Sequence, residues 1–368
     1  MELRRSFSSI SRNYFQGIDR PLFATVVALL LFSIFNIYGI GGSQNPYFVK
    51  QIILVVVGIA AMSLFSFFNY RYLKNYSLLV FSFYVLALVL LAMPFLFHSI
   101  RGVKSWIVIA GFTVEPVELM KLVLIVLMAK YFSQRHAHIN DWRHVAVSGV
   151  YCLVPAAITL IQPDLGSAMI IFFIWLGMLL TAGINKRHLA VLLALVACSA
   201  VAGWFFVLKP YQKVRIVSFL NPASDPRGSG YNLIQSRIAI GAGHWFGSGW
   251  GNGPQTQNGF LPEPYNDFVF AATADQFGLF GIAAVLGAIL FIISRIIVIG
   301  ERPASNFGKL FALGLTILIA THAFIGAAVN VGLMPVTGIP FPFLSYGGSN
   351  LMLLMVGIGI LQSIKRYG

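Results

Sequence analysis

Long apolar runs alternate with short polar stretches along almost the whole chain. A membrane-spanning helix needs about 20 mostly apolar residues, and ten stretches are candidates. They are Pro21–Gly39, Gln51–Asn69, Tyr76–Phe97, Pro116–Tyr131, Val145–Ile161, Leu165–Ile184, His188–Leu208, Phe268–Ser294, Leu310–Gly332 and Tyr346–Ile364. The pattern predicts an all-α integral membrane protein with ten transmembrane helices in one polytopic domain, residues 1–368. The first run is long and lacks a small-residue cleavage site, so we expect it to be a span and not a cleaved signal peptide.

The composition agrees with this pattern. Hydrophobic residues make up 58% of the 368 residues and charged residues 10%, against roughly a quarter charged in soluble domains. The mean hydropathy of +0.82 excludes a soluble enzyme, a disordered regulator and a nucleic-acid-binding module. The two cysteines, Cys152 and Cys198, lie inside apolar segments and imply no disulfide framework.

The net charge of +14 is spread thinly between the apolar runs, so it indicates topology and not nucleic-acid binding. An even number of spans puts both termini on one side of the membrane. Sixteen Lys and Arg fall on that side: Arg4, Arg5, Arg12, Arg20, Arg71, Lys74, Lys130, Arg135, Arg143, Lys186, Arg187, Arg295, Arg302, Lys309, Lys365 and Arg366. The short loops of the other side carry Lys50, Arg101 and Lys104. We therefore expect cytoplasmic termini, a cytoplasmic tail over residues 1–20, and one large extracytoplasmic loop between helices 7 and 8, residues 209–266.

The acidic residues predict which face carries the chemistry. Of the eleven, seven map to outer loops or to the outward halves of spans: Glu115, Glu118, Asp164, Asp225, Glu263, Asp267 and Asp275. Carboxylates at membrane depth are costly and by default indicate function. The outer face is the expected working face.

The stretch Glu115–Lys121 opens the fourth predicted span. Proline suits a first helical turn, which places Glu118 and Lys121 three residues apart on one helix face. A local ion pair near the helix end is one interpretation. A lysine one turn deeper needs a partner or a watery cavity, which favours an anion or substrate contact.

The stretch Gln162–Ser167 joins spans five and six by a short outer turn. Asp164 either caps the following helix or lines the rim of an outward cavity, and the sequence does not separate these alternatives.

The long loop contains Arg215, whose guanidinium suits a phosphate, although a solvated or lipid-bound arginine is the alternative. Residues Asn232–Ala242 are expected to form a short amphipathic helix at the membrane interface.

The stretch Leu261–Phe268 follows, where the chain re-enters the membrane. Asn266 can cap the next helix, which leaves Asp267 as a carboxylate at the mouth of the outer cavity, suited to a general base. Asp275, about two turns deeper, is either a structural partner or a proton-path residue.

Three prolines and several glycines lie in Gly332–Ser349 at membrane depth. Such backbone is tolerated where it is buried in protein or lines a cavity, and the N–H groups of the turn Ser345–Ser349 could bind an anion. A plain outer hairpin is the alternative.

His322 is expected to be a hydrogen-bonded packing residue. No spacing predicts a metal cage, although a loosely held Mg²⁺ or Mn²⁺ beside a diphosphate would leave no motif, so no cofactor is assigned.

Together, a candidate base, basic groups and apolar walls suit a lipid-linked phosphorylated substrate that reacts outside the cytoplasm. Because nucleotide donors are absent there, the leaving group would be a lipid diphosphate.

With these features the chain resembles the shape, elongation, division and sporulation (SEDS) family, which includes RodA, FtsW and SpoVE. The resemblance rests on ten spans with a large loop between the seventh and eighth and on these stretches: Arg101-Gly102, Ser105-Trp106-Ile107, Glu115–Lys121, Gln162–Ser167, Arg215–Ser236, Leu261–Phe270 and Gly332–Ser349. The run Met334–Pro340 is more similar to the RodA branch than to FtsW. The chain departs from the family pattern at Val117, Ser248, Asn266 and Asp275-Gln276.

The resemblance implies a peptidoglycan glycosyltransferase of the bacterial cytoplasmic membrane that polymerises lipid II, with undecaprenyl diphosphate as leaving group. It implies that Asp267 is catalytic. Substrate binding is expected at Glu118, Lys121, Arg101, Arg215, Asp164 and Ser345. The implied partners are a class B penicillin-binding protein and membrane proteins of the elongation complex, with no nucleic acid. A lipid II flippase and a non-catalytic scaffold for the penicillin-binding protein remain as alternatives.

Overall fold

A computed structural model describes residues 17–96, 105–109, 112–135, 141–206, 208, 210–222, 228–302 and 305–368. Nine helices in these ranges are long and apolar enough to cross a membrane. They are α2 (Arg20–Gly41), α3 (Pro46–Phe67), α5 (Ser77–Ala92) continued by the 3₁₀ turn η1 (Met93–Leu96), α7 (Trp142–Ile161), α8 (Leu165–Ala182), α9 (Lys186–Phe206), α13 (Val269–Glu301), α14 (Asn306–Val331) and α15 (Gly348–Tyr367).

The predicted fourth span is also a helix, α6 (Pro116–Arg135), but its four charged side chains are too many for a span by composition alone. Fourteen of its 20 residues are buried. An interior helix can carry charges that a lipid-facing helix cannot, because protein groups solvate them. The structure thus supplies a helix for each of the ten predicted spans, nine of which meet the criteria of length and composition.

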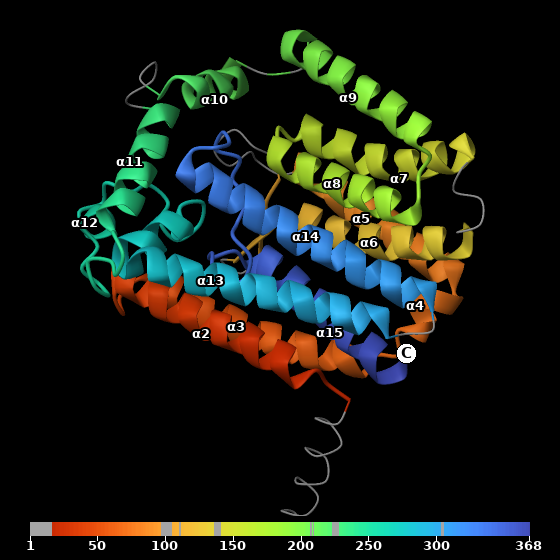
Figure 1. The fold of residues 1–368 in the computed structure, drawn as a ribbon, viewed down its shortest axis with the longest axis horizontal. Helices are drawn as coiled ribbons and strands as arrows, with labels where there is room; N and C mark the ends of the chain where they lie inside the picture. The colour runs from red at the N-terminus through yellow and green to blue at the C-terminus, as the bar shows by residue number, and fades with distance from the viewer. Residues whose placement is uncertain are drawn as a thin grey trace, which may run out of the picture.

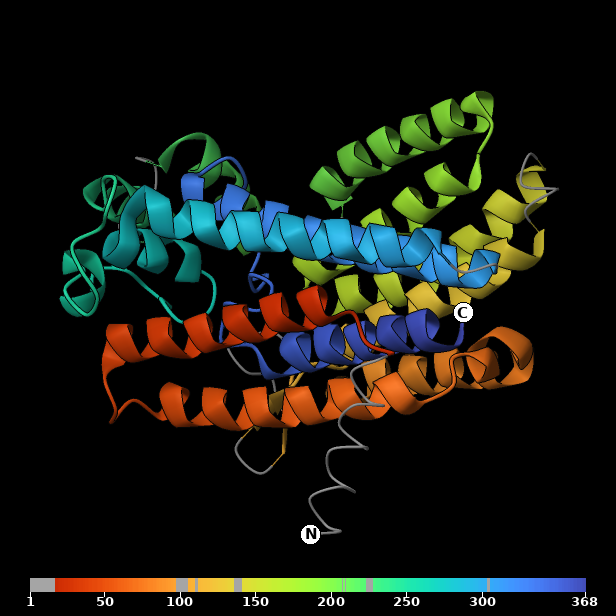
Figure 2. The ribbon, with the colours of Figure 1, turned by 60° about the horizontal axis from the view of Figure 1, so that its bottom comes forward.

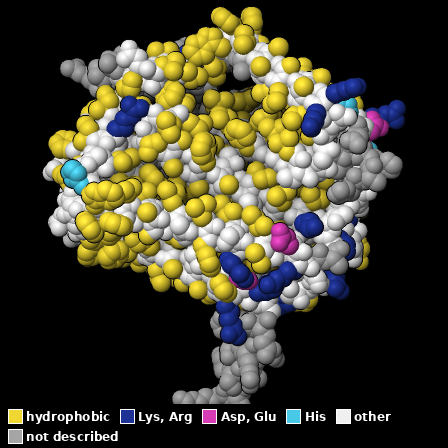
Figure 3. Space-filling model, in the orientation of Figure 1, with side chains coloured by type: hydrophobic (Ala, Val, Ile, Leu, Met, Phe, Trp, Pro, Cys, Tyr) yellow, Lys and Arg dark blue, Asp and Glu magenta, His cyan; other side chains and the backbone are white. Residues whose placement is uncertain are grey.

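The helices form one elongated bundle, in which α13 and α14 run side by side through the middle (Figures 1 and 2). Helix α3 packs against α15, α5 against α6, and α7 against α8. Helix α9 lies at the edge and is almost entirely exposed. Hydrophobic side chains cover most of the face drawn in Figure 3, and Lys and Arg are confined to a few groups. A bundle with such an apolar face suits a lipid environment.

The long loop between α9 and α13 folds into three helices, α10 (Pro210–Leu220), α11 (Ser229–Ala242) and α12 (Pro254–Gln257). The predicted helix over Asn232–Ala242 is therefore confirmed as a helix. The helices α10 and α12 of this loop were not predicted, and neither were the short helix α4 (Arg71–Asn75) and a hairpin of β1 (Ile107–Ile109) and β2 (Phe112–Val114). The two strands pair antiparallel, with Ile107 opposite Val114. The all-α prediction is thus wrong for this hairpin alone among the described residues.

Helix α13 is broken at Gly278, whose φ of 63° and ψ of −160° are not helical. The loop after α11 enters the break: Leu279 N–H donates to His244 O (2.9 Å), and Ser248 N–H donates to Asp275 O (2.9 Å). A Cβ on Gly278 would clash with the backbone nitrogen of Gly247. Only glycine allows this backbone conformation and this approach of two backbones, so the backbone groups freed by the break are bound by the loop.

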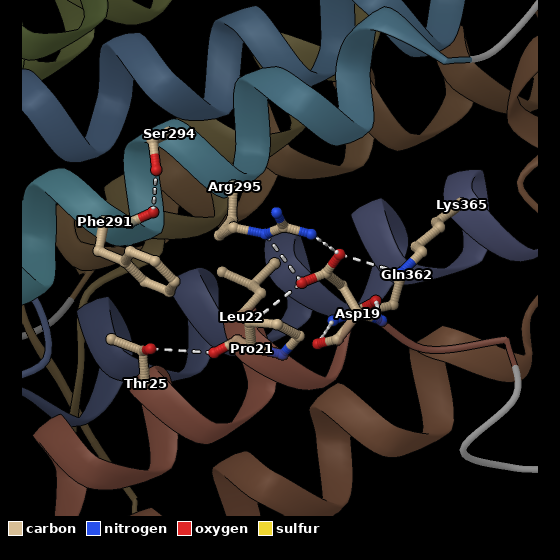
Figure 4. Close-up of polar contacts among 9 residues, drawn as sticks. All are labelled: Asp19, Pro21, Leu22, Thr25, Phe291, Ser294, Arg295, Gln362 and Lys365. Atoms are coloured by element: carbon tan, nitrogen blue, oxygen red, sulfur yellow. Dashed lines mark hydrogen bonds and ion pairs between the residues drawn. The ribbon is translucent and has the colours of Figure 1, made fainter.

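An ionic cluster joins the start of α2 to α13 and to the end of α15 (Figure 4). Asp19 caps α2 by accepting from Leu22 N–H (3.0 Å), and its other oxygen binds Arg295 of α13 (2.6 Å) and Lys365 of α15 (2.9 Å). The Asp19 N–H donates to Gln362 Oε1 (2.7 Å). Burial opposes ionisation of Asp19, but hydrogen bonds from Arg295, Lys365 and the Leu22 N–H outweigh it and lower its pKa from 3.8 to about 2. The start of α2 and the end of α15 therefore lie at the same end of the bundle.

Candidate functional site

The connection between α14 and α15, residues 332–347, is where the predicted motifs meet. It lies away from the Asp19 end of the bundle, because α15 starts from this connection and reaches Asp19 only in its last turn, through Lys365. A Cβ on Gly166, at the start of α8, would lie 2.7 Å from Thr337 O of this connection. Arg215 of α10 donates to Val336 O (3.4 Å). Segments that are 120 or more residues away in sequence thus contact this connection.

Asp267 lies in the turn before α13 and is half-buried. Three consecutive carbonyls of this turn are held from outside it. Tyr346 N–H donates to Tyr265 O (2.8 Å), Ser345 Oγ donates to Asn266 O (2.8 Å), and Asn330 Nδ2 donates to Asp267 O (2.8 Å). The backbone that carries the Asp267 carboxylate is therefore fixed by α14 and by the 332–347 connection.

The start of α13 is capped from another helix. The N-cap position is Phe268, which has no capping side chain, and Asn330 Oδ1 of α14 accepts from Ala271 N–H (3.0 Å). The prediction that Asn266 serves as the cap is wrong, because its side-chain amide donates to Glu263 Oε2 instead (3.2 Å). Asn330 was not identified as a site residue from the sequence. It lies within an apolar span, 63 positions from its partner Asp267.

Asp275 is a structural partner of the long loop. One of its carboxylate oxygens accepts from Gln255 N–H (3.1 Å), Thr256 N–H (3.0 Å) and Thr256 Oγ1 (3.0 Å) at the start of α12. The neighbouring Gln276 accepts from Gly251 N–H (3.0 Å). The structure thus favours the structural alternative for Asp275, which anchors the loop on α13.

Glu118 and Lys121 form a buried cluster with His322 of α14 and Asn350 of α15. Lys121 Nζ lies 2.7 Å from Glu118 Oε1 and 3.4 Å from His322 Nε2. Asn350 Nδ2 lies 3.3 Å from Glu118 Oε2 and 3.0 Å from His322 Nδ1. All four residues are buried. Lys121 thus has the partner that its depth requires, and His322 is the hydrogen-bonded interior residue that the sequence predicts; whether substrate contacts Glu118 or Lys121 stays a prediction.

Glu115, Asp164 and Ser349 lie near this cluster. Glu115 N–H donates to Ser349 Oγ (2.8 Å), and Trp106 Nε1 donates to the Glu115 carboxylate. Burial raises the pKa of Glu115 from 4.5 to about 8, and the negative charges of Glu118 and Asp164 contribute to that rise. Asp164 caps α8 through Ser167 N–H (3.0 Å), as one of its two alternatives predicts. The other alternative for Asp164, the rim of an outward cavity, stays a prediction.

Two arginines of the long loop reach the 332–347 connection. Arg215 is exposed. Arg237 of α11 was not predicted; it donates to Gly332 O (2.9 Å) and Val331 O (3.3 Å) at the end of α14, where cations satisfy free carbonyls. The sequence feature that could have identified Arg237 is that it is the single basic residue in the amphipathic stretch Asn232–Ala242. The predicted positions Arg101 and Asp225 lie outside the described residues.

Part of the predicted anion site at Ser345–Ser349 is already occupied by protein contacts. Ser345 N–H donates to Phe341 O (3.2 Å), Tyr346 N–H is bound as described above, and the Ser345 side chain is buried. The first turn of α15 remains the candidate for anion binding. Within the described ranges no group of three or more His, Cys, Asp or Glu is placed to hold a metal ion. The outward cavity stays a prediction.

Comparison with known proteins identifies the family. Residues 18–368 match the family model of FtsW, RodA and SpoVE, described as a cell cycle protein. The peptidoglycan glycosyltransferase MrdB of Escherichia coli K12 is 31% identical over 95% of this chain and 94% of its own length. The stage V sporulation protein E of Bacillus subtilis 168 is 34% identical over 94% of each chain.

Solved structures agree. A chain of a peptidoglycan synthase complex, reported for its coordination of polymerization and crosslinking, superposes with a TM-score of 0.80 at 29% identity, covering 95% of this chain and 98% of that one. The RodA of Thermus thermophilus superposes with a TM-score of 0.70 at 24% identity, covering 95% of this chain and 97% of that one, and supports the fold. The chain belongs to the FtsW/RodA/SpoVE (SEDS) family of multi-pass membrane proteins.

Proposed function

We propose that this protein is a peptidoglycan glycosyltransferase that polymerises lipid II into glycan strands on the outer face of the bacterial cytoplasmic membrane, for cell elongation. The relatives named as peptidoglycan glycosyltransferases support the activity. The single observation that carries it to this chain is the turn of Asp267: a half-buried carboxylate on a backbone held at three consecutive carbonyls. Such rigidity is what a general base needs to meet its substrate in one geometry.

In this proposal Asp267 accepts the proton of the acceptor sugar 4-hydroxyl as its oxygen attacks the anomeric carbon of the donor chain. The bond from that carbon to the diphosphate breaks, undecaprenyl diphosphate leaves, and the configuration inverts. Arg215 and Arg101 are proposed to bind the diphosphate, because a guanidinium matches phosphate oxygens in two hydrogen bonds. Glu118, Lys121, Asp164 and Ser345 are also proposed to bind or position substrate.

The proposed topology has ten spans, cytoplasmic termini and residues 209–266 outside, in one polytopic domain. It is supported by the Asp19 cluster, since residues from the first and last spans meet there. It is also supported by the position of Asp267, Glu115 and Asp164 at the opposite end of the bundle. The proposed partners are a class B penicillin-binding protein, in line with the synthase complex that this fold resembles, and other membrane proteins of the elongation complex.

The decisive experiment adds labelled lipid II to the protein purified with its class B partner, whose transpeptidase is blocked. Asp267→Asn keeps the size of the side chain and removes its basicity. Asp141→Asn is the matched control, an exposed aspartate at the start of α7. We expect glycan polymer on a gel from wild type and Asp141→Asn and none from Asp267→Asn.

Three other outcomes would contradict this proposal in different ways. If no variant makes polymer but lipid II crosses the membrane of vesicles that contain the wild type, the flippase is correct. If polymer forms equally with Asp267→Asn, the base is another residue. If polymer forms with the partner alone, the chain is a scaffold.

A further inference from the structure

A polar cavity of about 450 Å³ lies at the Asp19 end of the bundle, away from the proposed active site. Its walls come from α4, the last turns of α6 and the start of α14. Lys74, Lys130, Gln134, Ser305 and Asn306 line it, and none of its lining residues is acidic. The cavity therefore gathers positive charge and hydrogen-bonding groups.

Among the residues that the structure describes, the two lysines have no acidic partner. Lys130 is 4% exposed and its ammonium donates to the Lys74 carbonyl, which supplies no negative charge. Within the described residues, neither lysine has a carboxylate within ion-pair distance, in contrast to Lys365, which binds Asp19. A buried cation without a counter-ion is costly, so an anion in this cavity would relieve two like charges at once.

The start of α14 adds to this potential. Ser305 is the N-cap of this 26-residue helix, and the next two residues also line the cavity. The N-terminus of a long helix carries partial positive charge and free N–H groups. Together with the amide of Gln134, these groups suit several oxygens on one anion, as in a phosphate.

The surface beside the cavity indicates where that phosphate comes from. Tyr72, within α4, and Tyr76, directly after it, stack with ring centroids 6.1 Å apart and are 50% and 56% exposed. Leu78, at the start of α5, is 78% exposed. Exposed tyrosines next to an apolar helix face are typical of the membrane interface, where basic pockets between helices bind lipid head groups. A free phosphate ion has no apolar part that could pack against this surface, whereas a phospholipid has acyl chains.

We propose that this cavity binds the phosphate of an anionic phospholipid between Lys74, Lys130 and the N-terminus of α14. The acyl chains of the lipid would lie against Tyr72, Tyr76 and α5. Bound lipid would hold α4, α6 and α14 together at this end of the bundle.

The test measures the unfolding temperature of the purified full-length protein in a neutral detergent. Three probes are added at equal ionic strength: dioctanoyl phosphatidylglycerol, dioctanoyl phosphatidylcholine and inorganic phosphate. Lys74→Gln is the test variant because its side chain is exposed, so the change leaves the core intact. Lys186→Gln is the matched control, an exposed lysine at the start of α9.

We expect phosphatidylglycerol to raise the unfolding temperature of wild type and Lys186→Gln, and more than phosphatidylcholine does. In Lys74→Gln the concentration for half of this rise should increase by about fivefold, as for the loss of one charge-assisted contact. An equal response of Lys74→Gln and wild type, or no response to any probe, would overturn the proposal. An equal rise with inorganic phosphate at the same concentration would overturn the lipid as the source and retain the phosphate site.

Discussion

Replacing Asp19 by Asn tests whether the ionic cluster stabilises the bundle. Asparagine caps a helix as well as aspartate does, so the substitution removes the charge and keeps the cap on α2. The pKa of Asp19 falls from 3.8 to about 2, and a tenfold change in an acid dissociation constant corresponds to about 1.4 kcal/mol. The Asp19 side chain is 1% exposed, but those of Arg295 and Lys365 are 25% and 22% exposed. Water screens these partners in part, so we expect a loss of about 2 kcal/mol.

The pH dependence of this effect has a definite sign. The pKa of the folded state lies below that of the unfolded state, so the stabilisation is complete above the unfolded value of 3.8 and is lost as the pH falls through about 2. About half of the wild-type stabilisation should be lost by pH 3. The difference in stability between wild type and Asp19→Asn should therefore be constant from pH 8 to 5 and shrink below pH 4.

The assay is the unfolding temperature of the detergent-purified protein, followed by intrinsic fluorescence. For 368 residues and an unfolding entropy of roughly 2 cal/mol/K per residue, 2 kcal/mol lowers the unfolding temperature by about 3 °C. Asp141→Asn is the control, because Asp141 caps α7 through Arg143 N–H (3.1 Å) but is exposed. Equal shifts in Asp19→Asn and Asp141→Asn at pH 7 would refute the role assigned to the ion pairs.

Three further substitutions have clear expected outcomes. Lys121→Met leaves the buried Glu118 without its counter-ion and should cost about 3–5 kcal/mol of stability; adding Glu118→Gln should recover part of it, which a double-mutant cycle in unfolding temperature would measure. Asn330→Leu removes the bonds to Asp267 O and Ala271 N–H, so the rate of lipid II polymerisation should fall even at temperatures where the variant stays folded, and an unchanged rate would contradict the positioning role. Gly278→Ala should lower the unfolding temperature, because its Cβ would clash with the backbone of Gly247, whereas Gly287→Ala, with open space around the Cβ, should not.

The sequence by itself determined the membrane-spanning helices and the segregation of their charges. Both are local properties: apolar length decides whether a segment spans, and loop charges decide which way it faces. For that reason each of the ten predicted spans corresponds to a helix. The helix over Asn232–Ala242 was predictable on the same local grounds.

Only the tertiary structure decided how the turn of Asp267 is held and how α13 is broken. The carbonyl of Asp267 is bound by a side chain 63 positions away, and a helix cap supplied by another helix leaves no pattern near the cap. The break at Gly278 exists because a loop from before α13 replaces its missing hydrogen bonds. The two alternatives for Asp275 were likewise separated only by its contact with α12. Hydrogen bonds between distant segments form when packing brings the partners together, and local sequence carries no record of that geometry.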